Sequence, residues 1–247
     1  MPLFPDNSSI RCLLLDIEGT TSSIDFVYKT LFPYASAHAE GYLREHFAEK
    51  EVTKLIESLR TEQAREAMNG AGIAEWRGDS AEEMIKAAAS YVQHLIALDR
   101  KVTPLKTLQG MIWEDGFREG ELKGHVYEDV PRAFAKWKSE GKRIAIFSSG
   151  SVQAQKLLFG YSIAGDLTKY IDAYFDTTTG AKREAASYEA IAKTLGLSAE
   201  NVLFISDIAA ELDAAREAGI QTALMLRTGN SPPNLEAHPC IQNFDGL

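Results

Sequence analysis

The sequence predicts an α/β fold, in which a doubly wound, mostly parallel sheet carries a separate all-helical domain as an insertion. Three observations support this prediction. Apolar runs alternate with helical patterns in the second half of the chain, one more apolar run lies near the start, and the long interval between them has helical periodicity. Strands that alternate with helices indicate a parallel sheet covered by helices.

Five apolar runs are predicted to be buried strands, at residues 10–15, 143–147, 170–175, 201–205 and 222–226. Short continuous apolar runs are typical of strands that are buried on both faces. The later runs alternate with helical patterns at residues 131–140, 152–159, 187–195 and 209–218. The sheet is therefore expected to have helices on both sides.

The interval after the first strand is predicted to form its own helical domain. Apolar residues recur at three- and four-residue spacing over residues 30–47, 51–68, 80–98 and 105–118. A structureless loop of this length is improbable inside one compact domain. We expect a core domain of residues 1–21 and 125–247, and a helical domain of residues 22–124.

Composition limits the function classes. The 247 residues carry a net charge of -9, which argues against non-specific nucleic-acid binding. No apolar run approaches the ~20 residues of a membrane helix, and the chain opens without a secretory signal pattern. Its two cysteines lack metal-ligand spacing and suit a reducing compartment. We expect a monomer in the cytoplasm that binds neither nucleic acid nor membrane.

Reactive side chains follow the predicted strands. Asp16 ends the first, Ser148 and Ser149 follow the second, Asp176 follows the third and Asp207 the fourth. Because the carboxyl ends of parallel strands share one edge, where open α/β folds bind ligands, these groups are expected to converge. An aspartate at a single strand end is more often a helix cap, so the prediction depends on the combination.

Clustered carboxylates indicate a cation. If Asp16, Glu18 and Asp207 met within ~4 Å, each pair would repel by about 4 kcal/mol at an effective dielectric near 20. A divalent cation or protonation must offset this repulsion. Oxygen ligands select a hard ion, and Mg²⁺ is the usual choice beside a phosphate.

The same residues suit phosphoryl transfer. Asp16 is the candidate nucleophile, since a covalent aspartyl phosphate divides one difficult displacement into two easier ones. Glu18, two residues on, is placed to protonate the leaving oxygen and then to deprotonate water. Ser148, Ser149 and Lys182 supply donors and positive charge for phosphate oxygens, although a lysine taken alone is more often on the surface.

The motifs resemble the haloacid dehalogenase superfamily, whose Asp-x-Asp/Glu-x-Thr opening, hydroxyl, lysine and late acidic pair match this order. More closely, the chain resembles the enolase-phosphatase family of methionine salvage. Three segments carry this resemblance, namely DIEGTTSSIDFVYKTLFPYA at 16–35, FSSGSVQAQKLLFG at 147–160 and YFDTTTGAKREAASYEAIA at 174–192. DRKVTPLKTLQG at 99–110 and FISDIAAELDAAREAG at 204–219 extend the likeness over nearly the whole chain. Glu18 agrees with this family, because most of the superfamily has aspartate there.

This resemblance implies a Rossmann-like core, a helical cap domain and a small phosphorylated diketone as substrate. The diketone, 2,3-diketo-5-methylthiopentyl 1-phosphate, would be enolised and then dephosphorylated to the acireductone. By the same resemblance Mg²⁺ would bind Asp16, Glu18 and Asp207, with Glu211 holding a metal-bound water, and phosphate would bind the residues Ser148, Ser149 and Lys182. Candidate cap contacts to substrate lie in one family-like block and are Arg100, Lys101, Lys106, Gln109 and Trp113, of which Trp113 is equally well explained as core. The five histidines lie in no shared motif and are predicted to be structural.

Two competing functions remain open. The first is a capped phosphatase of the same superfamily that acts on another small phosphate ester without enolisation. The second is a receiver-type regulatory module, in which a phosphoaspartate is the signal. Glu18 argues against the receiver, since it would hasten hydrolysis of the phosphoaspartate. A dinucleotide-binding motif and a P-loop are both missing from the sequence.

Overall fold

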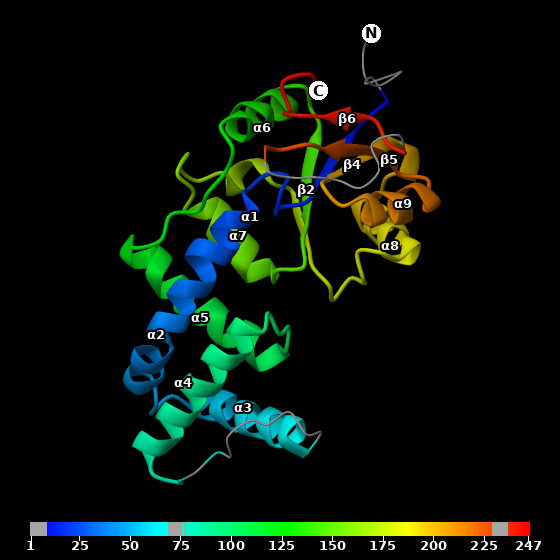
Figure 1. Cartoon of the computed structure of the whole chain (residues 1–247). Helices are drawn as coiled ribbons and strands as arrows, with labels where there is room; N and C mark the ends of the chain where they lie inside the picture. The colour runs from blue at the N-terminus through cyan, green and yellow to red at the C-terminus, as the bar shows by residue number, and fades with distance from the viewer. Residues whose placement is uncertain (1–8, 69–75, 77, 229–236) are drawn as a thin grey trace. The chain divides into compact units, whose positions relative to one another are not determined.

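The computed structural model describes residues 9–68, 76, 78–228 and 237–247. The chain divides into two compact units, one of residues 1–26 with 123–247 and one of residues 27–122 (Figure 1). The sequence-based boundaries were 21/22 and 124/125. Each unit is described separately below.

The first unit is built on a six-stranded parallel sheet with the order β3-β2-β1-β4-β5-β6. Its strands are β1 (Cys12–Leu15), β2 (Arg143–Phe147), β3 (Ala173–Phe175), β4 (Val202–Ser206), β5 (Gln221–Met225) and β6 (Cys240–Ile241). The expected doubly wound α/β fold is confirmed. β1 lies in the middle of the sheet, where Leu15 is in register with Ile146 of β2 and with Ile205 of β4.

Helices cover both faces of this sheet. They are α1 (Ile24–Phe26), α6 (Asp129–Ser139), α7 (Val152–Gly160), α8 (Ala185–Leu195) and α9 (Ala209–Glu217), with 3₁₀ turns at Thr168–Tyr170 and Ala199–Asn201. On one face, Tyr188 of α8 and Leu212 of α9 pack with Leu14 and Phe204. Successive residues of a strand point to opposite faces of the sheet. The helices α6 and α7 contact one another through the rings of Phe134 and Phe159.

Two strands differ from the sequence-based ranges. The third was expected over residues 170–175 but begins at Ala173, because the Asp172 carboxylate itself accepts the Ile144 N–H at 2.8 Å and a 3₁₀ turn precedes it. The two-residue strand β6 was not predicted, since two residues are too few to carry a periodic pattern.

The second unit is helical. It begins with a π-helical turn (Val27–Leu31) and continues as α2 (Phe32–Glu45), α3 (Lys50–Met68), α4 (Ala81–Ala97) and α5 (Thr103–Glu119). Ser80 caps α4 through a reciprocal capping box with Glu83, and Gly120 ends α5 in the left-handed conformation at φ 81°. The helix predicted over residues 30–47 begins inside the π-helical turn Val27–Leu31 and continues as α2. In the parts of the chain that the structure describes, no helix is long and apolar enough to cross a membrane.

Candidate active site

The carboxyl edge of the sheet holds the strand-end side chains. Asp16 directly follows β1, Ser148 follows β2 and Asp207 follows β4, and these three strands are adjacent in the sheet. All three residues are buried, at 3–8% exposure. The sequence rule that parallel strands bring such groups to one edge therefore describes this site well.

A tight turn fixes Asp16. Its N–H donates to Ile205 O at 3.0 Å, and the N–H groups of Thr20, Thr21 and Ser22 all lie within 3.2 Å of Ile17 O. The Thr21 hydroxyl donates to Asp16 O at 3.0 Å. Because the backbone on both sides of Asp16 is hydrogen-bonded, its carboxylate has little freedom to move.

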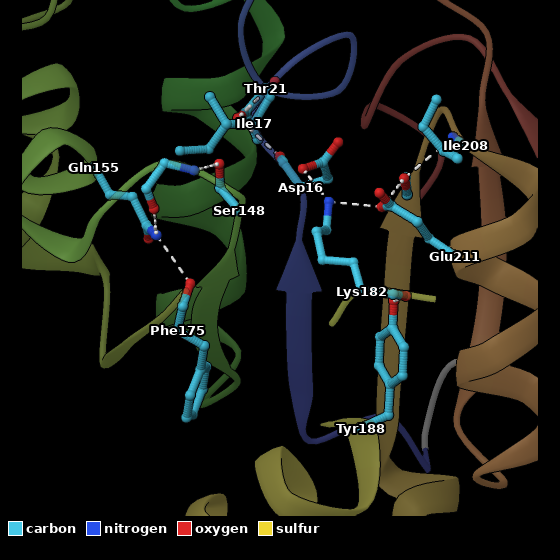
Figure 2. A network of polar contacts seen from close by, with 12 residues as sticks. Asp16, Ile17, Thr21, Ser148, Gln155, Phe175, Lys182, Tyr188, Ile208 and Glu211 are labelled. Carbon is cyan, nitrogen blue, oxygen red and sulfur yellow. Dashed lines mark hydrogen bonds and ion pairs between the residues drawn. The ribbon is translucent and has the colours of Figure 1, made fainter. Parts of the chain in front are cut away.

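Lys182 joins two acids of the site. Its Nζ lies 2.6 Å from Asp16 Oδ1 and 2.6 Å from Glu211 Oε2, and its side chain is only 9% exposed (Figure 2). Burial lowers the pKa of Lys182, but the neighbouring Asp16 and Glu211 carboxylates outweigh burial and raise it. The lysine is therefore a fixed cation, and its backbone carbonyl accepts the Tyr188 hydroxyl at 2.6 Å.

One lysine does not balance the acids around it. Burial, followed by the charges of Asp16 and Glu211, raises the pKa of Asp207 to about 7. Burial and Asp16 likewise raise the pKa of Glu211. Three buried carboxylates, Asp16, Asp207 and Glu211, therefore lie near a single lysine, Lys182.

This donor set fits a hard divalent cation. Carboxylate oxygens are the ligands that Mg²⁺ prefers, and a bound cation would offset the repulsion among Asp16, Asp207 and Glu211. Among the described residues, however, no three acidic, histidine or cysteine side chains are gathered as a metal-ligand cluster. Glu18, whose backbone bridges to Ser22, is half-buried. The ligand set of Asp16, Glu18 and Asp207 stays a prediction.

The loop after β2 was predicted to bind phosphate and leads into α7. Ser148 Oγ accepts the Gly150 N–H at 3.1 Å, so that the Ser148 hydroxyl proton is left for another acceptor. Ser151 caps α7 by accepting the Ala154 N–H at 3.2 Å. Helix N-termini attract phosphate through N–H groups that lack a partner, and here the N–H groups of Val152 and Ala154 already donate to protein oxygens. Ser149 lies in the same loop and is half-buried.

Asp176, the remaining strand-end acid, has a structural role in this loop. Its Oδ2 accepts the Val152 N–H at 3.2 Å and its Oδ1 accepts Thr178 N–H and hydroxyl bonds. It therefore caps α7 from outside, which is the alternative that a single strand-end aspartate always allows.

The predicted cap contacts lie in the helical unit. Gln109 and Trp113 are buried there, and Trp113 Nε1 donates to Leu31 O at 2.9 Å. Arg100 pairs with Glu66 at 2.5 Å. Lys101 is exposed and Lys106 half-buried. Trp113 thus belongs to the core of its unit, and substrate contact by the other four stays a prediction.

Two supporting residues were missed by sequence reasoning. The buried Ser206 hydroxyl donates to Glu211 Oε2 at 3.0 Å and accepts the Ile208 N–H at 3.1 Å, which fixes the Glu211 carboxylate. Gln155 of α7 donates to two carbonyl groups beside the Ser148 loop. Ser206 precedes Asp207 directly, and this adjacency was the one available signal.

Comparisons with known proteins agree with this geometry. The family model of haloacid dehalogenase-like hydrolases matches residues 10–219. An enolase-phosphatase E1 of Synechococcus elongatus is 53% identical over 239 residues, which cover 97% of this chain and 98% of that protein. One of Pseudomonas aeruginosa is 47% identical over 236 residues, covering 96% and 97%. The solved Unknown transcript 4 protein of Saccharomyces cerevisiae superposes with a TM-score of 0.78 at 36% identity, covering 96% of this chain and 100% of that one.

The match over residues 10–219 shows that the chain is a haloacid dehalogenase-like hydrolase. The parallel sheet, with Asp16 after β1, Ser148 after β2 and Asp207 after β4, agrees with that class. Within it, the chain belongs to the enolase-phosphatase E1 family, because relatives of that name match it at 47–53% identity over nearly its whole length.

Proposed function

We propose that the chain is a magnesium-dependent enolase-phosphatase of methionine salvage. It converts 2,3-diketo-5-methylthiopentyl 1-phosphate to the acireductone 1,2-dihydroxy-3-keto-5-methylthiopentene and inorganic phosphate. The observation that carries the proposal is the buried Lys182, which lies 2.6 Å from both Asp16 and Glu211 beside Asp207. The family's name supports the two-step reaction.

In this proposal Asp16, Glu18 and Asp207 hold Mg²⁺, and Ser148, Ser149 and Lys182 hold the phosphate. When bound, the ion supplies Lewis acidity and neutralises charge on the reacting oxygens. Lys182 keeps Asp16 Oδ1 in place through a 2.6 Å ion pair, which leaves Oδ2 as the attacking atom. Fixing the nucleophile in this way lowers the entropic part of the barrier.

The phosphoryl transfer takes two steps. Asp16 forms a bond to phosphorus while the bond from phosphorus to the substrate oxygen breaks, and Glu18 gives that oxygen its proton. Water then attacks the aspartyl phosphate, Glu18 takes a proton from it, and the Asp16 carboxylate and inorganic phosphate are released. The preceding enolisation moves a proton from carbon to a carbonyl oxygen without loss of atoms.

The net charge of -9 argues against a nucleic-acid partner and does not exclude a small phosphorylated substrate. We propose that the chain works as a monomer in the cytoplasm without contact to a membrane. Sedimentation of the purified protein at micromolar concentration tests whether it is a monomer, and a mass near twice 27.2 kDa would contradict this.

The decisive experiment mixes the protein with the diketo phosphate and Mg²⁺ in the absence of oxygen. Ultraviolet absorbance of enol species and release of inorganic phosphate are followed together. Enol that rises before phosphate supports both steps. Phosphate release without an enol signal contradicts the enolase step and favours the simpler capped phosphatase. A lasting phosphoprotein without turnover would favour the receiver-type module.

A further inference from the structure

We propose that Gln155 is the positioning residue of the phosphate loop, residues 148–151, and that it acts through the carbonyl group of Gly150. The inference rests on the proposed function, because the loop is the phosphate site only if the chain binds a phosphate ester. It adds a residue and a backbone donor to that site.

Gln155 ties the loop to the neighbouring strand. Gln155 is only 1% exposed. Its Nε2 lies 2.9 Å from Gly150 O and 2.9 Å from Phe175 O at the end of β3 (Figure 2). Since both neighbours are carbonyl oxygens, the amide must present its nitrogen to them. One side chain therefore holds the loop against the sheet edge.

This contact sets the direction of a backbone donor. A trans peptide group is planar, so its C=O and N–H point in opposite directions. With Gly150 O bonded to Gln155, the N–H of Ser151 points away from Gln155. No residue that the structure describes accepts a hydrogen bond from this N–H, and it stands at the start of the nine-residue α7. Such a group is a ready donor for an anion.

Packing alone does not account for an amide at position 155. Its Oε1 is buried and has no hydrogen-bond partner among the described residues. An unpaired buried acceptor destabilises a fold. Methionine has nearly the same length and would fill this space without an unpaired oxygen, so the two donated bonds are what glutamine provides here.

The test compares Gln155→Glu and Gln155→Met with Gln242→Glu. Gln155→Glu changes one atom and turns both donated bonds into contacts between a carboxylate and carbonyl oxygens. Gln155→Met removes the donors without adding charge. Gln242 is exposed and directly follows β6, which β1, β4 and β5 separate from β2 in the sheet, so Gln242→Glu reproduces the charge change away from the loop.

The measurements are KM and kcat with p-nitrophenyl phosphate, equilibrium binding of inorganic phosphate, and Tm. We expect Gln155→Met to raise KM and the phosphate Kd about tenfold, as for one ordinary hydrogen bond, with kcat changed less. Its Tm should fall, because Gly150 O and Phe175 O each lose a donor. Gln155→Glu should weaken binding more strongly. Gln242→Glu should match the wild type in all four quantities.

Unchanged phosphate binding in Gln155→Met would overturn the proposal, even if its Tm fell, because the side chain would then serve stability alone. An equal loss of binding in Gln242→Glu would also overturn it, since charge rather than position would be the cause. Failure of the proposed function gives a different result, in which the wild type itself neither binds phosphate nor hydrolyses the ester.

Discussion

Arg227 Nη1 lies 2.9 Å from Asp129 Oδ1, and both side chains are buried, at 6% and 7% exposure. The same arginine donates from Nε to Thr20 O at 3.0 Å, and Asp129 Oδ2 accepts the Phe244 N–H at 2.8 Å. This ion pair therefore connects the turn after Asp16 with the last residues of the chain. It supports the turn that follows Asp16.

Asp129→Ala is expected to lower the free energy of unfolding by about 3–5 kcal/mol, because it leaves the Arg227 charge buried without its partner. Urea unfolding followed by circular dichroism measures the change. The exposed pair between Arg132 and Asp245, at 3.1 Å, provides the control, and Asp245→Ala should have little effect. Equal effects of the two substitutions would contradict a special role for the buried pair.

Asp16→Asn should reduce phosphate release by roughly a thousandfold or more while the fold is retained, because an amide is a poor nucleophile and a weak Mg²⁺ ligand. Steady-state release of inorganic phosphate and a circular dichroism spectrum check both statements. Asp245→Asn, the same chemical change on the surface, should keep full activity. Turnover of the Asp16 variant close to that of the wild type would refute the nucleophile assignment.

Mg²⁺ should stabilise the wild-type protein in the absence of substrate, because a ligand that binds only the folded state raises Tm by mass action. Addition of ~10 mM MgCl₂ is expected to raise the Tm of the wild type and not that of Asp207→Asn, which has lost one carboxylate of the site. Differential scanning calorimetry with and without MgCl₂ makes this comparison. Equal gains in the two proteins would place the ion elsewhere.

His238 should make stability depend on pH. Its ring nitrogens are hydrogen-bonded to Thr222 Oγ1 at 2.8 Å and to Asp213 Oδ1 at 3.2 Å. Burial, followed by the Arg216 charge, lowers the pKa of His238. A histidine with a lowered folded-state pKa keeps its full contribution above the unfolded value, near 6.5, and loses it as pH falls. Asp207, whose folded-state pKa is raised to about 7, has the opposite effect and stabilises the fold as pH falls. The contribution of His238 is therefore measured as the difference in unfolding free energy between the wild type and His238→Gln, and this difference should move against the wild type between about pH 7.5 and 5.

The control for this pH effect is another histidine. His94→Gln, at an exposed position of α4, should follow the pH dependence of the wild type. Burial also lowers the pKa of His125, but this contribution is present in both the wild type and His238→Gln and cancels in their difference. A pH dependence of His238→Gln equal to that of the wild type would show that His238 does not contribute.

The sequence was most informative where a residue's position follows from a general rule of sheets. β1, β2 and β4 carry continuous apolar runs, and their carboxyl ends bring Asp16, Ser148 and Asp207 to one edge without any knowledge of side-chain contacts. The predicted range of β3 was less accurate, because the hydrogen bond from the Ile144 N–H to the Asp172 side chain shortens the strand.

The parts of the site that escaped prediction depend on single backbone groups. Gln155 resembles any polar helix residue in the sequence, and its contact with Gly150 O depends on where one carbonyl group points. The 2.6 Å contact between Lys182 and Glu211 likewise depends on how the loop before α8 folds back to the sheet. No periodic pattern encodes such directions.

The central place of β1 affects the order in which the molecule can form. Cys12–Leu15 is made before both of its partners in the sheet, Arg143–Phe147 and Val202–Ser206. Contacts between distant parts of the chain form slowly. The helical segment Val27–Leu122 is continuous and does not depend on these pairings. Asp16 is therefore made well before β4 but can reach its place only after β4 has been added.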